Sequence, residues 1–66
     1  MTIGQSIRRQ RENKGMTQIA LAKRIGIPNV YISWWETDRN IPSIFHAVCL
    51  ADVFEITLDE LVGRKP

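Results

Sequence analysis

Apolar residues recur at helical spacing in five short stretches of this 66-residue chain. Most stretches begin after a residue that can cap a helix and end near a turn former. The pattern predicts helices over about residues 3–14, 18–24, 28–36, 44–54 and 58–63. No stretch alternates apolar and polar residues between hairpin turns, so no strand is predicted. The expected fold class is all-α, a compact arrangement of five helices.

The expected helix starts depend on capping signals. Thr2 with Gln5, and Thr57 with Glu60, have the spacing of a capping box, in which two side chains satisfy each other's backbone N–H groups. Pro28 suits the first turn of the third helix, where its missing N–H would have no partner anyway. These signals are local, and they fix where helices begin without saying how the helices pack.

The third predicted helix carries three aromatic residues. Ile32 and Trp35 are three residues apart and share a face, which we assign to the core together with Tyr31. Adjacent helical residues point about 100° apart. If Trp35 is buried, Trp34 is therefore largely exposed and available to a partner. The alternative for Trp34 is a partly buried structural role.

The helix predicted over 44–54 is apolar on two sides. Its inner side is assigned to Ile44, Ala47, Val48, Leu50, Ala51 and Phe54. Phe45, Cys49 and Val53 follow each other at intervals of four on the opposite side, where a two-faced helix is polar. A second apolar stripe predicts contact with another chain. The alternatives are that the helix is rotated relative to this assignment, or that the chain after Gly63 covers the stripe.

Composition excludes several classes of protein. The single cysteine cannot form an internal disulfide, and one Cys with one His cannot build a zinc site. No apolar run approaches the roughly 20 residues that cross a bilayer, and no signal peptide is visible. We expect one domain over residues 1–66, located in the cytoplasm, with no metal, cofactor or small-molecule ligand. No nucleophile with a base beside it is evident, so an enzyme is not expected.

Charge is divided unevenly along the chain. Residues 1–40 hold seven Lys or Arg against three Asp or Glu, whereas residues 41–66 hold two against four. A basic front half suits a polyanionic partner, although chance asymmetry on a solvated surface would look the same. Charge alone does not decide between these two readings.

Residues 17–36 have the pattern of a helix-turn-helix. Thr17 can cap the first helix, Ala22 is small where two helices would cross, and Gly26 supplies the left-handed residue of a short turn. Leu21 and Ile25 are expected to face inward. The outer face of the second helix would then be free to enter a groove; it comprises Asn29, Val30, Ser33 and Trp34.

At these positions the chain resembles the phage-repressor-type regulators, the lambda-repressor-like or XRE-like helix-turn-helix family. The resemblance covers about residues 3–63. The matching residues are Thr17-Gln18, Leu21-Ala22, Ile25-Gly26, Tyr31-Ile32-Ser33, Trp35-Glu36, Pro42-Ser43, Leu50-Ala51 and Leu58-Asp59-Glu60-Leu61. The resemblance implies a five-helix DNA-binding domain whose third helix lies in the major groove of double-stranded DNA. It also implies a transcriptional regulator, here taken as a repressor that binds a palindromic operator as a homodimer.

The resemblance also implies roles for individual positions. Base-reading positions are Asn29, Val30, Ser33 and Trp34; positions at the DNA backbone are Thr17, Gln18, Arg39 and Asn40. Gln18 either contacts a phosphate or supports the recognition helix. Arg11 and Glu36 correspond to a pair that ties the first helix to the third, and Arg11 can also touch phosphate. A dimer or partner interface is expected at Phe45, Cys49, Val53, Ile56, Leu58 and Val62.

Four positions depart from the family pattern. Pro28 replaces the usual Ser or Thr cap, Trp34 stands where polar or basic residues are common, and Gln10 replaces a frequent leucine. Glu55 occupies a position where glycine often ends the fourth helix. These departures leave the target sequence open. The alternative function is a protein-interaction module, such as the antitoxin-type subunit of a larger complex.

Overall fold

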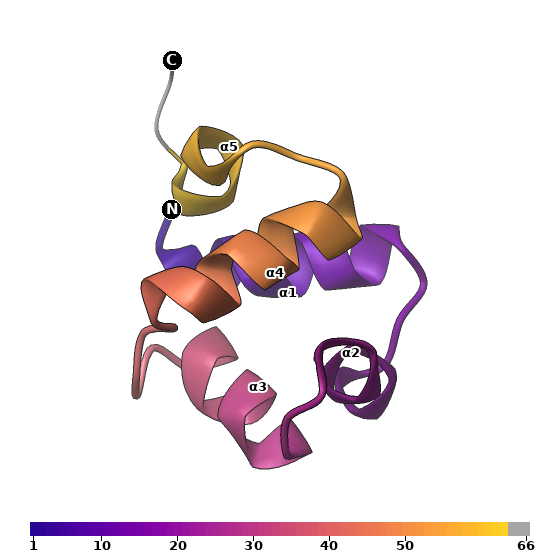
Figure 1. The fold of residues 1–66 in the computed structure, drawn as a ribbon. Coiled ribbons are helices and arrows are strands. Elements are labelled where there is room, and N and C mark those ends of the chain that lie inside the picture. Colours follow the sequence, from indigo (N-terminus) through magenta and orange to yellow (C-terminus); the bar gives the residue numbers. More distant parts are fainter. Residues whose placement is uncertain (64–66) are drawn as a thin grey trace.

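A computed structural model describes residues 1–63, and these residues form five helices without a strand (Figure 1). The helices are α1 (Ile3–Asn13), α2 (Gln18–Ile25), α3 (Asn29–Glu36), α4 (Ile44–Phe54) and α5 (Leu58–Val62). The predicted all-α architecture is confirmed, and each helix boundary lies within one residue of its predicted position.

Both predicted capping boxes are present. The N–H of Gln5 donates to Thr2 Oγ1 at 3.1 Å, and the N–H of Thr2 donates to Gln5 Oε1 at 3.0 Å. The same reciprocal pair joins Thr57 and Glu60 at the start of α5. Because each box closes within four residues, the sequence alone was enough to place these helix starts.

Pro28 takes a different place from the predicted one. It is the N-cap of α3, with ψ at 140°, and the helix begins one residue later at Asn29. The ψ value is extended rather than helical, so Pro28 belongs to the turn. A proline side chain has no hydrogen-bonding atom, and α3 accordingly has no side-chain cap.

The core forms between the five helices: α1 packs against α3, α4 and α5, and α2 packs against α3 and α4 (Figure 1). Its members are apolar and almost fully buried: Ile7, Leu21, Ala22, Ile32, Trp35, Ala47, Leu50, Ala51, Phe54 and Leu61. Ile3 and Ile25 are partly buried and pack against this cluster, and for Ile25 this agrees with the predicted inward face. The burial of Ile32 and Trp35 anchors α3 by one face only.

The predicted rotation of α4 was partly wrong. Ile44 and Val48 were assigned to the core but are exposed, at 63% and 42%. Val53 was assigned to the opposite arc but is half-buried and packs against the core. A helix that is apolar nearly all round gives no clear inner face from sequence, so the packing of α1, α2 and α5 against it decides the rotation.

An exposed ion pair joins the end of α1 to the end of α4. Lys14 Nζ lies 2.9 Å from Glu55 Oε1, and this contact lowers the pKa of the Glu55 carboxyl. A lowered pKa in the folded state stabilises the fold above the ordinary Glu pKa, and that contribution is lost as pH falls through the lowered value. Glu55, which stands where glycine is frequent in the family, ends α4 in the left-handed conformation, with φ at 58°.

Candidate nucleic-acid interface

The helix-turn-helix predicted over residues 17–36 is present at the end of the molecule opposite α5 (Figure 1). Thr17 caps α2 by accepting from the N–H of Ala20 at 3.0 Å. Gly26 is left-handed, with φ at 77°, and ends α2. Ala22 is buried, which lets α2 and α3 approach closely. The short turn therefore fixes α3 relative to α2.

The outer face of α3 agrees only in part with the prediction. Asn29 and Val30 are exposed at the start of the helix, as predicted. Ser33 and Trp34 are half-buried. The most accessible side chains of the predicted base-reading set thus lie in the first turn of α3.

The core assignment of Tyr31 was wrong, and Trp34 agrees with the alternative stated for it, a partly buried position. Tyr31 was assigned to the core but is 40% exposed, whereas Trp34 was expected to be largely exposed and is half-buried. The two rings meet edge to face, with centroids 5.4 Å apart. The Arg39 guanidinium lies over the Trp34 ring, 5.5 Å from its centroid. Neighbouring side chains, rather than the core, therefore cover Trp34.

Arg11 and Glu36 form the predicted tie between α1 and α3. Arg11 Nε and Nη2 donate to the two carboxylate oxygens of Glu36 at 2.7 and 3.0 Å. Arg11 Nη1 also donates to the carbonyl of Met16 at 2.8 Å. The Glu36 side chain is only 3% exposed, and its hydrogen bond raises the pKa of Arg11. These bonds give Arg11 a structural role and leave little of it for a phosphate.

Gln18 joins this pair from α2. Its Nε2 donates to Glu36 Oε1 at 3.2 Å, so three helices meet at one carboxylate. Of the two roles predicted for Gln18, this contact matches support of the recognition helix. A buried carboxylate is stable only when hydrogen-bond donors or a cation pair with it, and here both oxygens of Glu36 accept from such donors.

Thr17, Arg39 and Asn40 are exposed, as a contact with the DNA backbone requires. Arg39 and Asn40 belong to the connector between α3 and α4, which spans residues 37–43. Their backbone N–H groups both donate to the carbonyl of Trp34, at 2.9 and 3.3 Å. The connector is thereby attached to the last turn of α3.

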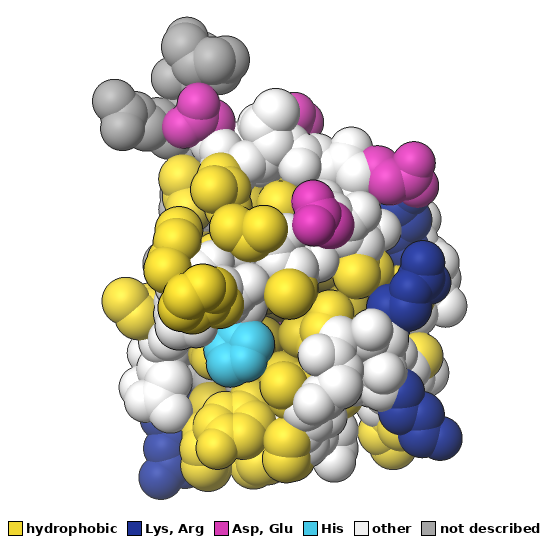
Figure 2. Space-filling model, viewed as in Figure 1, with side chains coloured by type: hydrophobic (Ala, Val, Ile, Leu, Met, Phe, Trp, Pro, Cys, Tyr) yellow, Lys and Arg dark blue, Asp and Glu magenta, His cyan; other side chains and the backbone are white. Residues whose placement is uncertain are grey.

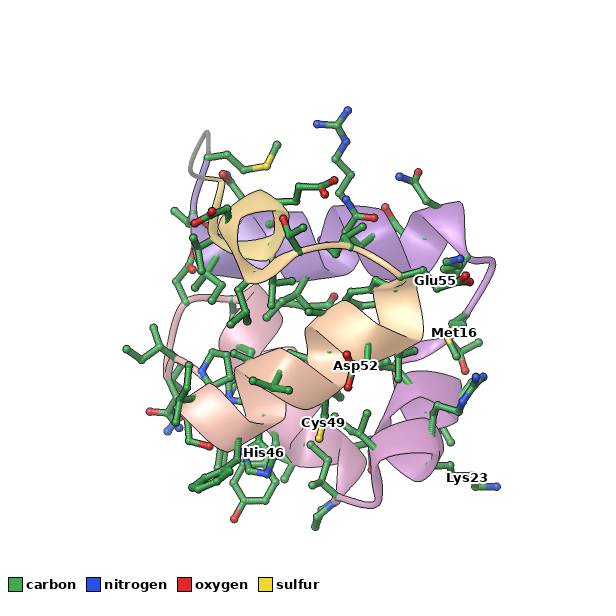
Figure 3. All side chains as sticks on the ribbon, turned by 45° about the horizontal axis from the view of Figure 1, so that its top comes forward. Met16, Lys23, His46, Cys49, Asp52 and Glu55 are labelled. Carbon is green, nitrogen blue, oxygen red and sulfur yellow. The ribbon has the colours of Figure 1, made fainter. Side chains whose placement is uncertain are left out.

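Acidic and basic side chains are concentrated on different parts of the surface, although they meet at the Lys14–Glu55 pair. Figure 2 shows acidic side chains over the α4–α5 end, while the basic ones visible in this view lie along the sides toward α2 and α3. Figure 3 places Lys23 on α2 and Glu55 at the far end of α4. A basic surface beside the helix-turn-helix favours an anionic partner at that end of the molecule.

An apolar surface lies on α4 and α5. The exposed apolar side chains there, and just before α4, are Ile41, Ile44, Phe45, Val48, Leu58 and Val62. We call this set the α4–α5 apolar face; it appears as the hydrophobic area on the upper left of Figure 2. Cys49, also predicted for an interface, is exposed beside Asp52 on α4 (Figure 3).

Two other residues of the predicted interface have different surroundings. Val53 and Ile56 are half-buried and pack against the core. Ile41, which was not predicted for the interface, is instead among the most exposed apolar residues, at 75%. The chain after Gly63, considered as a cover for this surface, lies outside the described residues.

Two residues that hold α3 in place, Gly4 and Asp38, were not predicted from the sequence. Gly4 lies so close to α3 that an added Cβ would contact the carbonyl of Trp35 and come within 2.6 Å of Asp38 Oδ1. Asp38 is left-handed, with φ at 60°, and its carboxylate contacts the first turn of α1. The sequence signal for this close approach was a glycine in the first turn of a helix, where no local turn requires one.

Within residues 1–63 there is no group of three or more side chains suited to holding a metal ion. No pocket is enclosed by the same residues. None of their helices is both long and apolar enough to cross a membrane.

The chain is similar to known regulators of transcription. A family model described as helix-turn-helix matches residues 7–61. The structure superposes on the P22 c2 repressor protein in complex with synthetic operator 9T with a TM-score of 0.91, at 29% identity and 98% coverage of both chains.

Two curated relatives extend the comparison. The cryptic phage CTXphi transcriptional repressor RstR of Vibrio cholerae is 34% identical over 97% of this chain. The HTH-type transcriptional activator BcrR of Enterococcus faecalis is 29% identical over 98% of it. The chain spans only 57% and 32% of the lengths of these relatives.

Proposed function

This chain belongs to the helix-turn-helix family, and on that premise we propose that it is a sequence-specific regulator of transcription that binds double-stranded DNA through α3. One observation carries the proposal: α3 is anchored by Ile32 and Trp35, while Asn29 and Val30 remain exposed at its start. A major groove about 12 Å wide accepts one α-helix, and residues at the front of that helix reach base edges.

The chemistry of α3 favours A·T base pairs. Asn29 can pair with the N6 and N7 edge of adenine, and Val30 can pack against a thymine methyl group. The helix carries no Lys or Arg, the residues that most often read guanine. We therefore propose that the bases facing the first turn of α3 are adenine and thymine.

Contacts with the DNA backbone would hold α3 in its groove. Thr17 precedes α2, and Arg39 and Asn40 follow α3 in the sequence; all three residues are exposed. A phosphate contact contributes affinity for any sequence and makes binding weaker as salt concentration rises. In this proposal Gln18 supports α3 through Glu36 rather than acting as a primary phosphate contact.

We assign the chain the role of a repressor, in which an occupied operator blocks transcription. RstR, the more similar of the two curated relatives above, is named as a repressor and supports this choice. We propose that residues 1–66 act as one DNA-binding domain in the cytoplasm, where the DNA lies. No catalytic role, cofactor or small-molecule ligand is included in the proposal.

We propose further that two copies bind one palindromic site. The α4–α5 apolar face is the contact that we assign to the homodimer, with Phe45 at 79% exposure as its most exposed member. The molecule is 31 Å in its longest dimension. Two copies side by side can thus place their α3 helices one DNA turn apart, about 34 Å.

Asn29 and Arg39 are expected to affect binding in different ways. Asn29→Ala should lose about 1–3 kcal/mol of discrimination at one base position in each half-site. Arg39→Ala should weaken binding to all sequences to a similar extent and reduce the salt dependence. Selection of bound duplexes from a random pool, followed by affinity titration at two salt concentrations, measures both effects. An unchanged motif for Asn29→Ala would contradict its role in base reading.

Phe45 is expected to control self-association. Phe45→Asp places a charge on the α4–α5 apolar face and should shift the molecule to a monomer, because an unpaired buried charge opposes the interface. Sedimentation equilibrium over micromolar to millimolar protein measures the change. Ile19→Asp, at another exposed apolar residue on α2, is the matched control and should leave association intact. Equal association of the Phe45 variant and the unaltered chain would place the interface elsewhere.

The second candidate function is that of a protein-interaction module. The α4–α5 apolar face favours it, because the same side chains can receive a different chain. In that case the domain would act as an antitoxin-type subunit of a larger complex. Titration with duplex DNA at low salt separates the candidates: absence of binding to every duplex in the pool rejects the DNA-binding proposal.

A further inference from the structure

The connector between α3 and α4 contains an acidic residue directly before Arg39. Asp38 is not a glycine, yet its backbone is left-handed, a conformation that costs about 1 kcal/mol or more for an L-residue. Its side chain turns to α1: Oδ2 accepts from Thr2 Oγ1 at 2.9 Å, and Oδ1 accepts from the N–H of Gly4 at 3.3 Å. The positive end of α1 thus receives the carboxylate.

The start of the connector is bound to the last turn of α3. Thr37 Oγ1 donates to the carbonyl of Ser33 at 2.9 Å, and the N–H groups of Arg39 and Asn40 donate to the carbonyl of Trp34. The left-handed turn at Asp38 lies between these bonds. The backbone at Arg39 is therefore held from two sides, by α3 and by α1.

The side chain of Arg39 is held as well. Its guanidinium lies over the Trp34 ring at 5.5 Å, and Tyr31 supports that ring edge-on. Within residues 1–63, Arg39 makes no ion pair with a carboxylate. The guanidinium thus lies over the indole ring, while Arg39 as a whole is exposed and can donate to an anion.

We propose that Trp34 and Asp38 are positioning residues that hold Arg39 ready for a DNA phosphate. Trp34 acts through Arg39 and does not read a base, and Asp38 fixes the turn while its charge is satisfied at α1. This inference rests on the proposed function, because the phosphate belongs to the DNA that α3 binds. Preorganisation of this kind lowers the entropy lost when Arg39 binds.

A double-mutant cycle tests the coupling between Trp34 and Arg39. Trp34→Leu removes the ring face, Trp34→Phe keeps an aromatic ring, and Arg39→Gln removes the charge. Affinity for a duplex selected by the unaltered protein is measured for each variant and for the Trp34→Leu/Arg39→Gln combination. Trp34→Leu should weaken binding about 2- to 5-fold alone, the size of an exposed cation–π contact, and have almost no effect when Arg39→Gln is present. Trp34→Phe should retain most of the affinity.

Asp38 is tested in the same way with Asp38→Gly, which keeps the left-handed turn accessible but removes both acceptors. It should weaken binding only when Arg39 is present. The slope of log affinity against log salt concentration should become less steep by about 0.9 for Arg39→Gln, the value for one phosphate contact. The positioning variants should make it less steep by a smaller amount. If a variant weakened DNA binding only by destabilising the fold, it would weaken binding in the Arg39→Gln background as well.

A measurement without DNA completes the test. In the free protein, the Arg39 Hδ protons should show an upfield ring-current shift that Trp34→Leu abolishes. Absence of that shift, or equal effects of Trp34→Leu with and without Arg39, overturns this inference while leaving the proposed function standing. Failure of the unaltered protein to bind any duplex overturns the proposed function and this inference together.

Discussion

Arg11→Met is expected to destabilise the fold by about 3–5 kcal/mol, the cost of removing one partner of a buried ion pair. The substitution keeps the apolar stem of the side chain but leaves the Glu36 carboxylate, 3% exposed, with Gln18 as its remaining donor in the described chain. It also removes the donor to the Met16 carbonyl. A chain of 66 residues has roughly 3–10 kcal/mol of stability in total, so the variant should be largely unfolded at moderate temperature.

Urea denaturation followed by far-ultraviolet circular dichroism measures this loss. Arg8→Met is the matched control on the same helix: Arg8 pairs with Glu12 at 3.5 Å, but both side chains are more than half exposed. That pair should contribute at most about 1 kcal/mol. The double variant Arg11→Met/Glu36→Leu should be more stable than Arg11→Met alone, because it leaves no buried charge. Equal losses for the Arg11 and Arg8 variants would show that the buried pair does not hold the helices together.

The Arg11–Glu36 pair also has a defined pH dependence. The raised pKa of Arg11 means that its contribution is present at neutral pH and at alkaline pH below the ordinary Arg pKa. It is lost only as pH rises through the raised value in the folded state. Alkaline pH below the pKa of Arg11 should therefore not destabilise the fold as the Arg11 substitution does.

Gly4→Ala is expected to destabilise the fold by about 1–3 kcal/mol, although alanine is the better helix former. The new methyl group would contact the carbonyl oxygen of Trp35, which is backbone and cannot rotate away, and the carboxylate of Asp38. Relief requires α1 and α3 to separate, which would disturb the core around Ile7 and Trp35. Thermal unfolding should record a lower midpoint, by about 4–8 °C for each kcal/mol in a domain of this size.

Gly15→Ala provides the comparison for Gly4. Gly15 is left-handed, with φ at 67°, and an added Cβ there meets nothing within 4 Å. Its substitution should cost about 1 kcal/mol from backbone conformation alone, with no change in helix packing. A rise in stability for Gly4→Ala, as helix propensity alone predicts, would mean that α1 does not lie as close to α3 as the structure places it.

Local sequence was sufficient for the helices and for the helix-turn-helix. The capping boxes at Thr2 and Thr57, the Thr17 cap and the left-handed Gly26 were all predicted and are all present. Each of these features is decided by groups within about four residues of each other. The sequence also determined the inner face of α3 at Ile32 and Trp35, because a single stripe at helical spacing has one way to face the core.

Tertiary structure alone decided which surface each ambiguous residue meets. The rotation of α4 could not be predicted, since its apolar residues are spread nearly all round and only packing selects among them. Trp34 is covered by Arg39, a residue outside its helix, and Gly4 matters because of Trp35 and Asp38, more than 30 residues away. Such contacts arise only after the helices have assembled, when distant segments are brought to within a few ångströms, and no spacing along the chain encodes that distance.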